Sequence, residues 1–390
     1  MIDNLSKYQC TGCSACLSAC PKQAISMHED YEGFLYPQID YRLCVKCHKC
    51  DSVCESIKPL EKTKSIPKVY GAIAKDENMR LSSSSGGVFP LLAQYILSLG
   101  GIVFGAAFDN ELDVVHIGIN SVTEINKLQG SKYVQSRIGN VFCQIKNELE
   151  QGRYVLFVGT PCQVNGLLHF LPHLYEKLFT VDFICHGVPS PKVWREYLKE
   201  LTCQYGNIIN PPQCTFRSKK AGWINYSISI PFDSPYYGTK DKDPYLLAFL
   251  KNLCLRPSCY SCNAKGISRN SDITLADFWA IKKFAPHLFD DKGASLIFIH
   301  SEKGKYIVDK EKNNLELWNV DLEKLKPYIV SAYSSAKSNK YKREKFMKMI
   351  GEKPMNYLVR KYGKESYIYK IKVSIMAVIL KIMGKKSKWD

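Results

Sequence analysis

The residues best suited to chemistry are eight cysteines near the N-terminus. They form two runs with the same spacing, Cys-x2-Cys-x2-Cys-x3-Cys, and the second run lies 34 residues after the first. Each iron of a 4Fe–4S cubane needs one thiolate, and in two-cluster ferredoxins the fourth cysteine of each run ligates the other cluster. The spacing therefore predicts two clusters, one on Cys10, Cys13, Cys16 and Cys54, the other on Cys20, Cys44, Cys47 and Cys50.

The residue that follows each run differs between the two copies. Pro21 follows Cys20, as the bacterial pattern asks, whereas Glu55 follows Cys54. We expect this departure to change the stiffness of the turn and not the ligands. Structural zinc, which also binds Cys-x2-Cys pairs, is the alternative, but zinc needs only four ligands and no duplicated four-cysteine run.

Four further cysteines lie in short motifs of the remaining chain. They are Cys162, Cys185, Cys259 and Cys262. Cys162 follows Thr160 and Pro161 at the start of a predicted helix, and Cys185 precedes His186 at the end of a predicted strand. Sheets of α/β proteins place ligands at such strand ends, and a helix N-terminus favours thiolate. Three interpretations stay open: a third cluster, a thiol enzyme using Cys162 and His186, and small buried core residues.

Other polar residues could hold a phosphate-bearing ligand. The segment 82–87 reads Ser-Ser-Ser-Ser-Gly-Gly and opens a predicted helix, so that its free N–H groups and the helix dipole would attract phosphate. An ordinary serine cap with a glycine turn is the simpler alternative. Arg217, Lys219 and Lys220 could also bind phosphates, although a short charge run is more often solvated. His186 is either a proton donor or a core histidine.

Strand–loop–helix units are predicted to position these residues. Apolar periodicity predicts a helix over 87–99, a hairpin over 102–119, and two units whose strands begin near 154 and 179. Such units favour an α/β core, or α+β for the whole chain. We expect a small bacterial-ferredoxin-like domain over 1–60, a mixed α/β domain over 69–335 and a basic helical tail over 336–390.

Composition limits where the chain could work. No apolar run reaches the roughly 18 to 20 residues that span a bilayer, and no secretory signal is present at the N-terminus. Sixteen cysteines in a reducing compartment favour metal or redox chemistry over disulfides. These features predict a cytoplasmic protein.

The formal charge of +17 is concentrated near the C-terminus. Residues 337–390 hold 16 Lys and Arg against 4 Asp and Glu, which leaves only +5 for the other residues. Residues 367–388 are predicted to form a basic amphipathic helix. Such a helix could lie at the inner face of a membrane, dock on a partner, or pack on its own domain. Nucleic acid is not favoured, because no recognition motif interleaves with the charges.

Seven short motifs follow one another in the large domain. They occupy residues 84–89, 130–136, 157–164, 182–190, 216–223, 256–262 and 272–279. In this order they resemble the coenzyme F420 hydrogenase/dehydrogenase beta-subunit family over roughly residues 69 to 310, with a two-cluster ferredoxin module in front. The resemblance implies an iron–sulfur flavoprotein with FAD, which relays electrons between 4Fe–4S clusters and a two-electron acceptor, either coenzyme F420 or another small molecule.

The resemblance also suggests roles for single residues. It maps a third 4Fe–4S cluster onto Cys162, Cys185, Cys259 and Cys262. The candidate contacts to FAD or substrate are Ser84, Ser85, Gly86, Gly87, Lys132, Thr160, Arg217 and Lys219. His186 is the candidate catalytic residue. The expected partners are a redox partner protein or ferredoxin and a small-molecule electron acceptor. The alternative function is an electron-transfer subunit of a larger complex with no substrate of its own.

Overall fold

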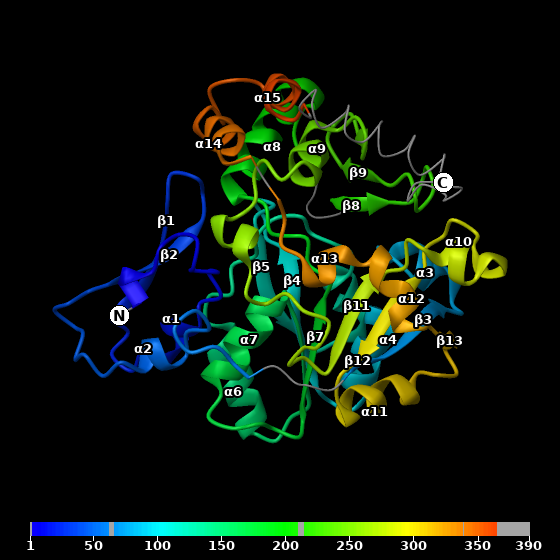
Figure 1. Cartoon of the computed structure of the whole chain (residues 1–390), viewed down its shortest axis with the longest axis horizontal. Helices are drawn as coiled ribbons and strands as arrows, with labels where there is room; N and C mark the ends of the chain where they lie inside the picture. The colour runs from blue at the N-terminus through cyan, green and yellow to red at the C-terminus, as the bar shows by residue number, and fades with distance from the viewer. Residues whose placement is uncertain (1, 62–65, 210–213, 338, 365–390) are drawn as a thin grey trace, which may run out of the picture.

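The structure is a computed structural model of the 390-residue chain, and it describes residues 2–61, 66–209, 214–337 and 339–364. The helix predicted over 367–388 lies outside the described residues. Figure 1 shows three regions: an N-terminal module in blue, a central sheet with helices on both faces, and a helical region at the top. The expectation of a mixed α/β protein with a separate N-terminal module is confirmed.

The central sheet has eight strands in the order β13-β3-β12-β11-β7-β6-β4-β5. Neighbouring strands among β4, β6, β7 and β11 are parallel, and the other pairs are antiparallel. The strands are β3 (Lys68–Ala74), β4 (Ile102–Phe108), β5 (Val114–Ile119), β6 (Val155–Val158), β7 (Leu178–Phe183), β11 (Ile273–Asp277), β12 (Ser295–Ile299) and β13 (Leu315–Asn319). The central strands read as nearly continuous apolar runs because both of their faces are covered.

Side chains that alternate along the strands build a core on each face of the sheet. On β6, Leu156 packs toward α4, whereas Phe157 packs with Phe142 toward α6 and α7. The first face carries α4 (Val88–Ser98), α5 (Ile125–Leu128) and α11 (Glu302–Lys310). The second face carries α6 (Val141–Glu150), α7 (Pro161–Phe170), α10 (Ile281–Phe284), α12 (Leu322–Leu325) and α13 (Val330–Tyr333). The helix predicted over 87–99 and the hairpin over 102–119 are confirmed as α4 and as β4 with β5.

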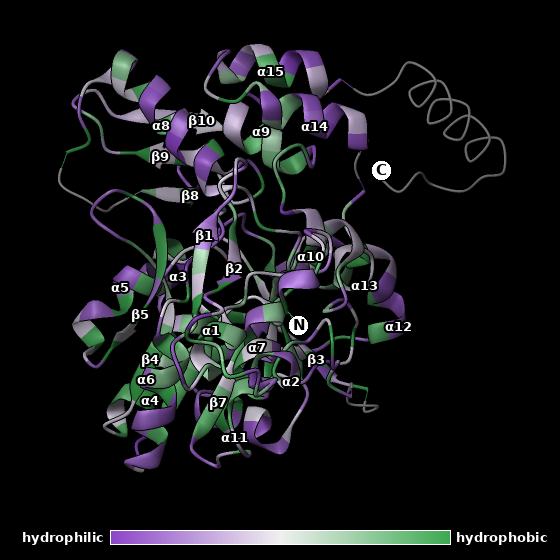
Figure 2. Ribbon diagram, turned by 90° about the vertical axis from the view of Figure 1, so that its left-hand side faces the viewer, coloured by the Kyte–Doolittle hydropathy of each residue, from purple (hydrophilic) through white to green (hydrophobic). Residues whose placement is uncertain are grey.

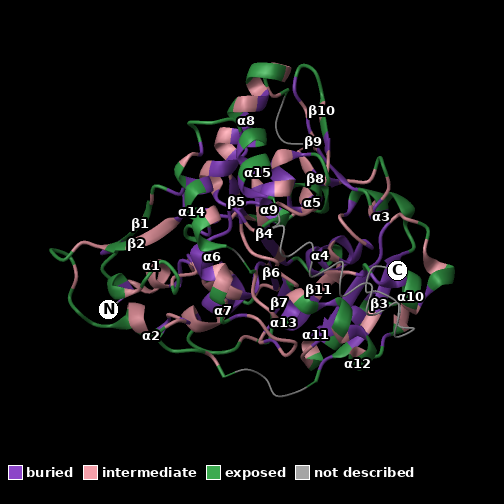
Figure 3. Ribbon diagram, turned by 45° about the horizontal axis from the view of Figure 1, so that its top comes forward, coloured by how far each residue is buried: buried purple, intermediate pink, exposed green. Residues whose placement is uncertain are grey.

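In the N-terminal module, each cysteine run spans a short helix that contains its third cysteine. Its elements are η1 (Ile2–Asn4), α1 (Ala15–Ala19), the antiparallel pair β1 (Ile25–Glu29) and β2 (Leu35–Ile39), and α2 (Lys49–Ser52). Ala15 and Val53 join the core formed by α6 and α7. Figures 1 and 3 show the module beside these two helices, so the module is attached to the second face of the sheet.

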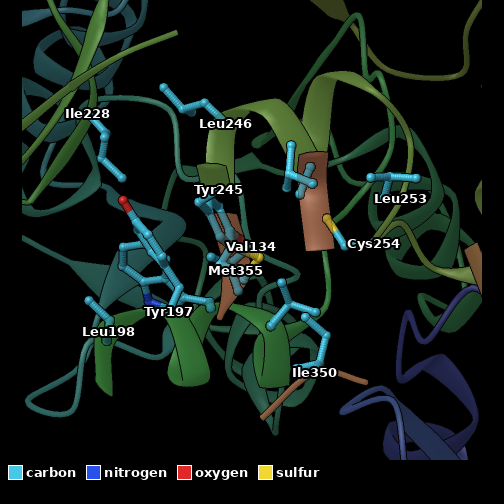
Figure 4. Packing of buried hydrophobic residues seen from close by; sticks show 14 of the residues in the cluster. Val134, Tyr197, Leu198, Ile228, Tyr245, Leu246, Leu253, Cys254, Ile350 and Met355 are labelled. Carbon is cyan, nitrogen blue, oxygen red and sulfur yellow. The ribbon is translucent and has the colours of Figure 1, made fainter. Parts of the chain in front are cut away.

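A second, smaller sheet organises the top region. Its strands are β8 (Thr215–Ser218), β9 (Ser227–Ile230) and β10 (Tyr236–Thr239). The helices around it are α8 (Pro191–Tyr205), α9 (Pro244–Leu250), α14 (Lys340–Lys348) and α15 (Met355–Tyr362). Figure 4 shows Tyr197, Tyr245 and Met355 packed together in this core. Residues 340–362 of the predicted tail therefore form part of a folded core and not a separate extension.

The remaining short elements connect these regions. They are α3 (Glu77–Ser82), η2 (Val122–Glu124), η3 (Pro257–Ser261), η4 (Pro286–Leu288) and η5 (Lys326–Tyr328). Figure 2 shows apolar residues concentrated in the central strands and in the helix faces that cover them. Among the helices of the described residues, none combines the length and apolar character that crossing a bilayer requires.

Candidate functional site

The first cysteine set comprises Cys10, Cys13, Cys16 and Cys54. Burial, together with the nearby thiols of Cys10 and Cys54, raises the pKa of the Cys13 thiol to about 11. The pKa of Cys16 is raised by burial first and then by the other three thiols. These couplings show that the last cysteine of the second run meets the first three of the first run, as in two-cluster ferredoxins.

The second cysteine set comprises Cys20, Cys44, Cys47 and Cys50. All four line one small cavity of about 20 Å³ in the N-terminal module. The same cavity is bordered by Lys22, Lys46 and Lys49, and Cys47 is exposed. The four cysteines thus lie around one cavity, and their role as ligands of one cluster stays a prediction.

The core cysteine set comprises Cys162, Cys185, Cys259 and Cys262, which come from α7, the end of β7, and η3. Burial raises the pKa of Cys162, as do Cys262 and Cys185. Burial and then Cys259 raise the pKa of Cys185 to about 12. Buried thiols of this kind are deprotonated when they coordinate a metal. The donor set therefore fits one 4Fe–4S cluster, although no three His, Cys, Asp or Glu side chains of the described chain are arranged to hold a single metal ion.

Helix α7 connects the first cysteine set with the core cysteine set. It begins at Pro161 after the capping residue Thr160, whose hydroxyl lies 3.1 Å from Cys162 Sγ. One turn later, a methyl group added at Gly166 would lie 2.9 Å from Cys13 Sγ. The Cys13 thiol also contributes to the raised pKa of Cys162. The two sets therefore lie close together along one face of this helix.

Glu55 fixes the N-terminal module to the same helix. Its carboxylate accepts a hydrogen bond from Asn165 Nδ2 at 3.2 Å and lies 2.8 Å from His169 Nε2. All three residues are largely buried. The replacement of proline by Glu55 therefore supplies a polar contact between the module and α7. The expectation that this departure changes the stiffness of the turn and not the ligands stays a prediction.

A cavity of about 440 Å³ lies where the parallel strands end. Its lining includes the core cysteine Cys185 together with most of the predicted site residues: Ser84, Ser85, Gly87, Lys132, Thr160, His186 and Arg217. They come from the segment before α4, the loop after α5, the start of α7, the loop after β7, and β8. A ligand at this edge of the sheet is what α/β topology favours.

Two of the predicted contacts support the cavity wall and do not line the cavity. Lys219 Nζ donates to the carbonyl oxygens of Arg80, Ser85 and Lys292 at 2.7 to 2.8 Å. Gly86 donates its backbone N–H to Ser295 Oγ at 2.9 Å. These bonds hold the segment 83–87 against the loop before β12. Direct ligand contact by these two residues stays a prediction.

The polar groups around the cavity suit an anionic, aromatic ligand. Arg217 donates to Asp277 at 2.8 Å, and its guanidinium carbon lies 4.8 Å from the ring centre of Trp279. Burial opposes the charge of Arg217, but Asp277 and Tyr133 outweigh it and raise the pKa. Burial lowers the pKa of Lys132 to about 7.

Two buried nitrogen atoms at this cavity have no hydrogen-bond partner among the described residues. They are Arg217 Nε and His116 Nδ1, and both residues line the cavity. Buried polar groups are normally satisfied. Because neither atom is accessible from the cavity, the two groups do not indicate which ligand binds there.

His186 has a defined tautomer. Its Nε2 lies 2.6 Å from Asn252 Oδ1, and Asn252 Nδ2 donates to the Lys337 carbonyl at 2.8 Å. The amide is thereby oriented, so the His186 Nε2–H donates to it. Burial lowers the pKa of His186, which keeps the ring neutral near pH 7. Its other nitrogen, Nδ1, is then a proton acceptor.

Comparison with known proteins agrees with this arrangement. Residues 152–324 match the family model for the C terminus of the beta subunit of coenzyme F420 hydrogenase/dehydrogenase. Residues 9–56 match a "4Fe-4S dicluster domain", which implies two 4Fe–4S clusters on the eight N-terminal cysteines.

A solved structure was also found, titled "Xenon derivatization of the F420-reducing [NiFe] hydrogenase complex from Methanosarcina barkeri". It is 18% identical to this chain, with 70% of this chain and 92% of that chain covered and a TM-score of 0.46. No curated protein gave a significant match.

The match to the F420 hydrogenase/dehydrogenase family encloses only part of the candidate site. All of the core cysteine set, Thr160, His186, Arg217 and Lys219 fall inside residues 152–324. The segment 84–87 and Lys132 lie before it, and the cavity joins them to the matched region. The chain thus combines a region similar to this family with a 4Fe–4S dicluster domain in front.

Several residues at the site were not identified from the sequence. Trp279 and Tyr226 flank Arg217, and His116 borders the cavity from β5. Trp279 lies in one of the seven motifs, which could have signalled its role. Arg256 lies in another motif and contacts the N-terminal module. His116 stands in an ordinary strand pattern and carries no such signal.

Proposed function

We propose that this chain is an iron–sulfur flavoprotein oxidoreductase that relays electrons between 4Fe–4S clusters and a two-electron acceptor through FAD. The observation that carries the proposal is Cys185, which belongs to the core cysteine set and also lines the 440 Å³ cavity. When bound, the clusters supply one-electron transfer, and the flavin exchanges one-electron for two-electron chemistry.

The cavity residues would bind and orient the flavin. Lys132 and Arg217 supply positive charge, and the N-terminus of α4 faces the cavity through Val88 and Phe89. Trp279 stacks on Trp223 with ring centres 4.6 Å apart and an angle of 9°. Trp279 is 43% exposed, so it supports binding of a planar ring at the cavity.

His186 would act on a proton near the cavity. Its Nε2–H is committed to Asn252, which leaves Nδ1 as an acceptor for a substrate or flavin N–H. Phe249 packs edge-to-face on the imidazole at 5.1 Å and fixes its plane. The thiol-enzyme alternative is not favoured, because the hydroxyl of Thr160 is the side-chain partner of Cys162 Sγ.

The second cysteine set would be the contact point for a redox partner protein. The stretch 41–49 is exposed apart from Cys44, and it includes Tyr41, Leu43 and Val45. Arg42, Lys46 and Lys49 lie on the same stretch. A basic, partly apolar surface is complementary to an acidic electron-carrier protein. The sixteen free thiols suit a reducing cytoplasm, which we propose as the location.

Metal and flavin analysis of the anaerobically purified chain tests the proposal. We expect about twelve irons and about one FAD per chain. The variant Cys185→Ser should lose about four irons, whereas the exposed, motif-free Cys203→Ser should lose none. About eight irons and no flavin in the unaltered chain would overturn the proposal. Flavin reduction without turnover of any screened acceptor would favour an electron-transfer subunit.

A further inference from the structure

Arg256 is a fully buried cation without a carboxylate partner. Its exposed fraction is 0%, and it forms no ion pair within the described residues. Asp30 and Glu32, in the hairpin that it touches, pair instead with Lys7 and Arg343. Buried arginines are nearly always paired, because an isolated buried charge is strongly destabilising. The balancing negative charge must therefore come from another group.

The guanidinium of Arg256 is aimed at the first cysteine set. Its Nη2 donates to Cys10 Sγ at 3.6 Å, and its Nε donates to the Cys10 carbonyl at 2.9 Å. Further bonds run to Gln135 Oε1 and to the Leu35 carbonyl, both at 2.9 Å. The ring of Tyr36 lies 4.3 Å from the guanidinium carbon and covers it.

The backbone at Gly12 leaves room for the Arg256 side chain. Gly12 has a φ of +71°, and a Cβ atom there would lie 2.7 Å from Arg256 Nη1. In the core, the Arg256 carbonyl accepts the backbone N–H of Cys259 at 2.9 Å. Arg256 therefore connects the first cysteine set with the core cysteine set.

We propose that Arg256 is a positioning residue for the 4Fe–4S cluster on the first cysteine set, which supplies the missing negative charge, and that Arg256 raises the redox potential of that cluster. Hydrogen bonds to cluster sulfurs and nearby positive charge stabilise the more negative, reduced state. The inference rests on the N-terminal clusters alone and is independent of the flavin and of the acceptor.

The test is a redox titration of the full-length protein, purified anaerobically and followed by electron paramagnetic resonance. In Arg256→Gln, the midpoint of the signal that Cys16→Ser alters should move to a lower potential, with iron content unchanged. Arg256→Lys retains the charge but not the fork of N–H donors, so it should shift the same midpoint less. Arg195→Gln is the matched control, because Arg195 also joins the module to the core but is paired with Glu29 and Asp113.

Unchanged midpoints in iron-replete Arg256→Gln would overturn the inference. If Arg256→Gln does not retain its iron, the midpoint potential of the same signal in Arg256→Lys is the deciding measurement. A midpoint lower than in the unaltered protein supports the inference, and an unchanged midpoint overturns it. A shift of equal size in Arg195→Gln would also overturn it, because the effect would then follow the interface and not this side chain. None of these readouts needs FAD or substrate, so a failure of the proposed flavin function would be recognised separately.

Discussion

The ion pair between Glu32 and Arg343 offers the sharpest test of how the two ends of the chain are held together. Glu32 lies in the hairpin of the N-terminal module, and Arg343 lies on α14. Arg343 donates to both carboxylate oxygens at 2.9 and 2.6 Å and also to the Leu255 carbonyl. The perturbation is Arg343→Met, which preserves bulk and removes the charge.

The magnitude follows from burial. The exposed fractions of the two side chains are 8% for Arg343 and 2% for Glu32, so the variant leaves a buried carboxylate without its charged partner, although the Tyr31 hydroxyl still donates to it. Breaking such a pair destabilises a protein by about 3–5 kcal/mol. At about 1.36 kcal/mol per factor of ten, 4 kcal/mol raises the undocked population roughly thousandfold. This is a large part of the roughly 5–15 kcal/mol that stabilises a typical domain.

The assay is hydrogen–deuterium exchange of the hairpin amides at residues 25–39. We expect exchange in Arg343→Met to be roughly thousandfold faster. The double variant Glu32→Met with Arg343→Met should return most of the protection, because apolar side chains replace buried pairs well. Lys199→Met breaks an exposed pair with Glu196 and should change little. Acceleration below about tenfold in the single variant, or no recovery in the double variant, would refute the reasoning.

Three further outcomes are expected. Gly166→Ala should lower thermal stability and iron content, because overpacking against the first cysteine set costs about 1–3 kcal/mol. This cost outweighs the helix propensity of alanine, which favours the helix by about 1 kcal/mol relative to glycine. A more stable, iron-replete variant would contradict this prediction. FAD binding should weaken up to about tenfold from pH 6 to 8, since burial lowers the pKa of Lys132 to about 7 and its charge is lost above that pH. In Lys132→Met, FAD binding should be weaker and should no longer change between pH 6 and 8. A retained pH dependence would show that another group causes it. Replacing Lys22, Lys46 and Lys49 together by Glu should slow reduction by an acidic electron-carrier protein and weaken its salt dependence, while reduction by dithionite stays unchanged.

The parts of the structure that the sequence could predict are those set by local spacing. The two cysteine runs define their grouping because three ligands of each set lie within one short loop. Helix α4 follows from apolar periodicity, with Pro90 in its first turn and Gly100 after its end. The hairpin of β4 and β5 follows from two apolar runs around a polar turn.

The parts that could not be predicted depend on contacts between distant segments. Glu55, the counterpart of Pro21, contacts a histidine and an asparagine of α7, which lie 114 and 110 positions further along the chain. The short strands β8–β10 carry too few residues for a clear alternation, and α14 is too polar in sequence to indicate that Phe346 and Met347 enter a core.

The ion pair between Glu32 and Arg343 can form only late in the synthesis of the chain. The two residues are 311 positions apart, so at about 5–20 residues per second the ribosome needs roughly 15–60 s to deliver the second after the first. Throughout that interval the N-terminal module is outside the ribosome while its final docking surface is unfinished. Its cysteines are accessible to iron and sulfide donors before the C-terminal helix closes over the hairpin. Synthesis of Arg343 thus marks the earliest point at which the ion pair with Glu32 can form.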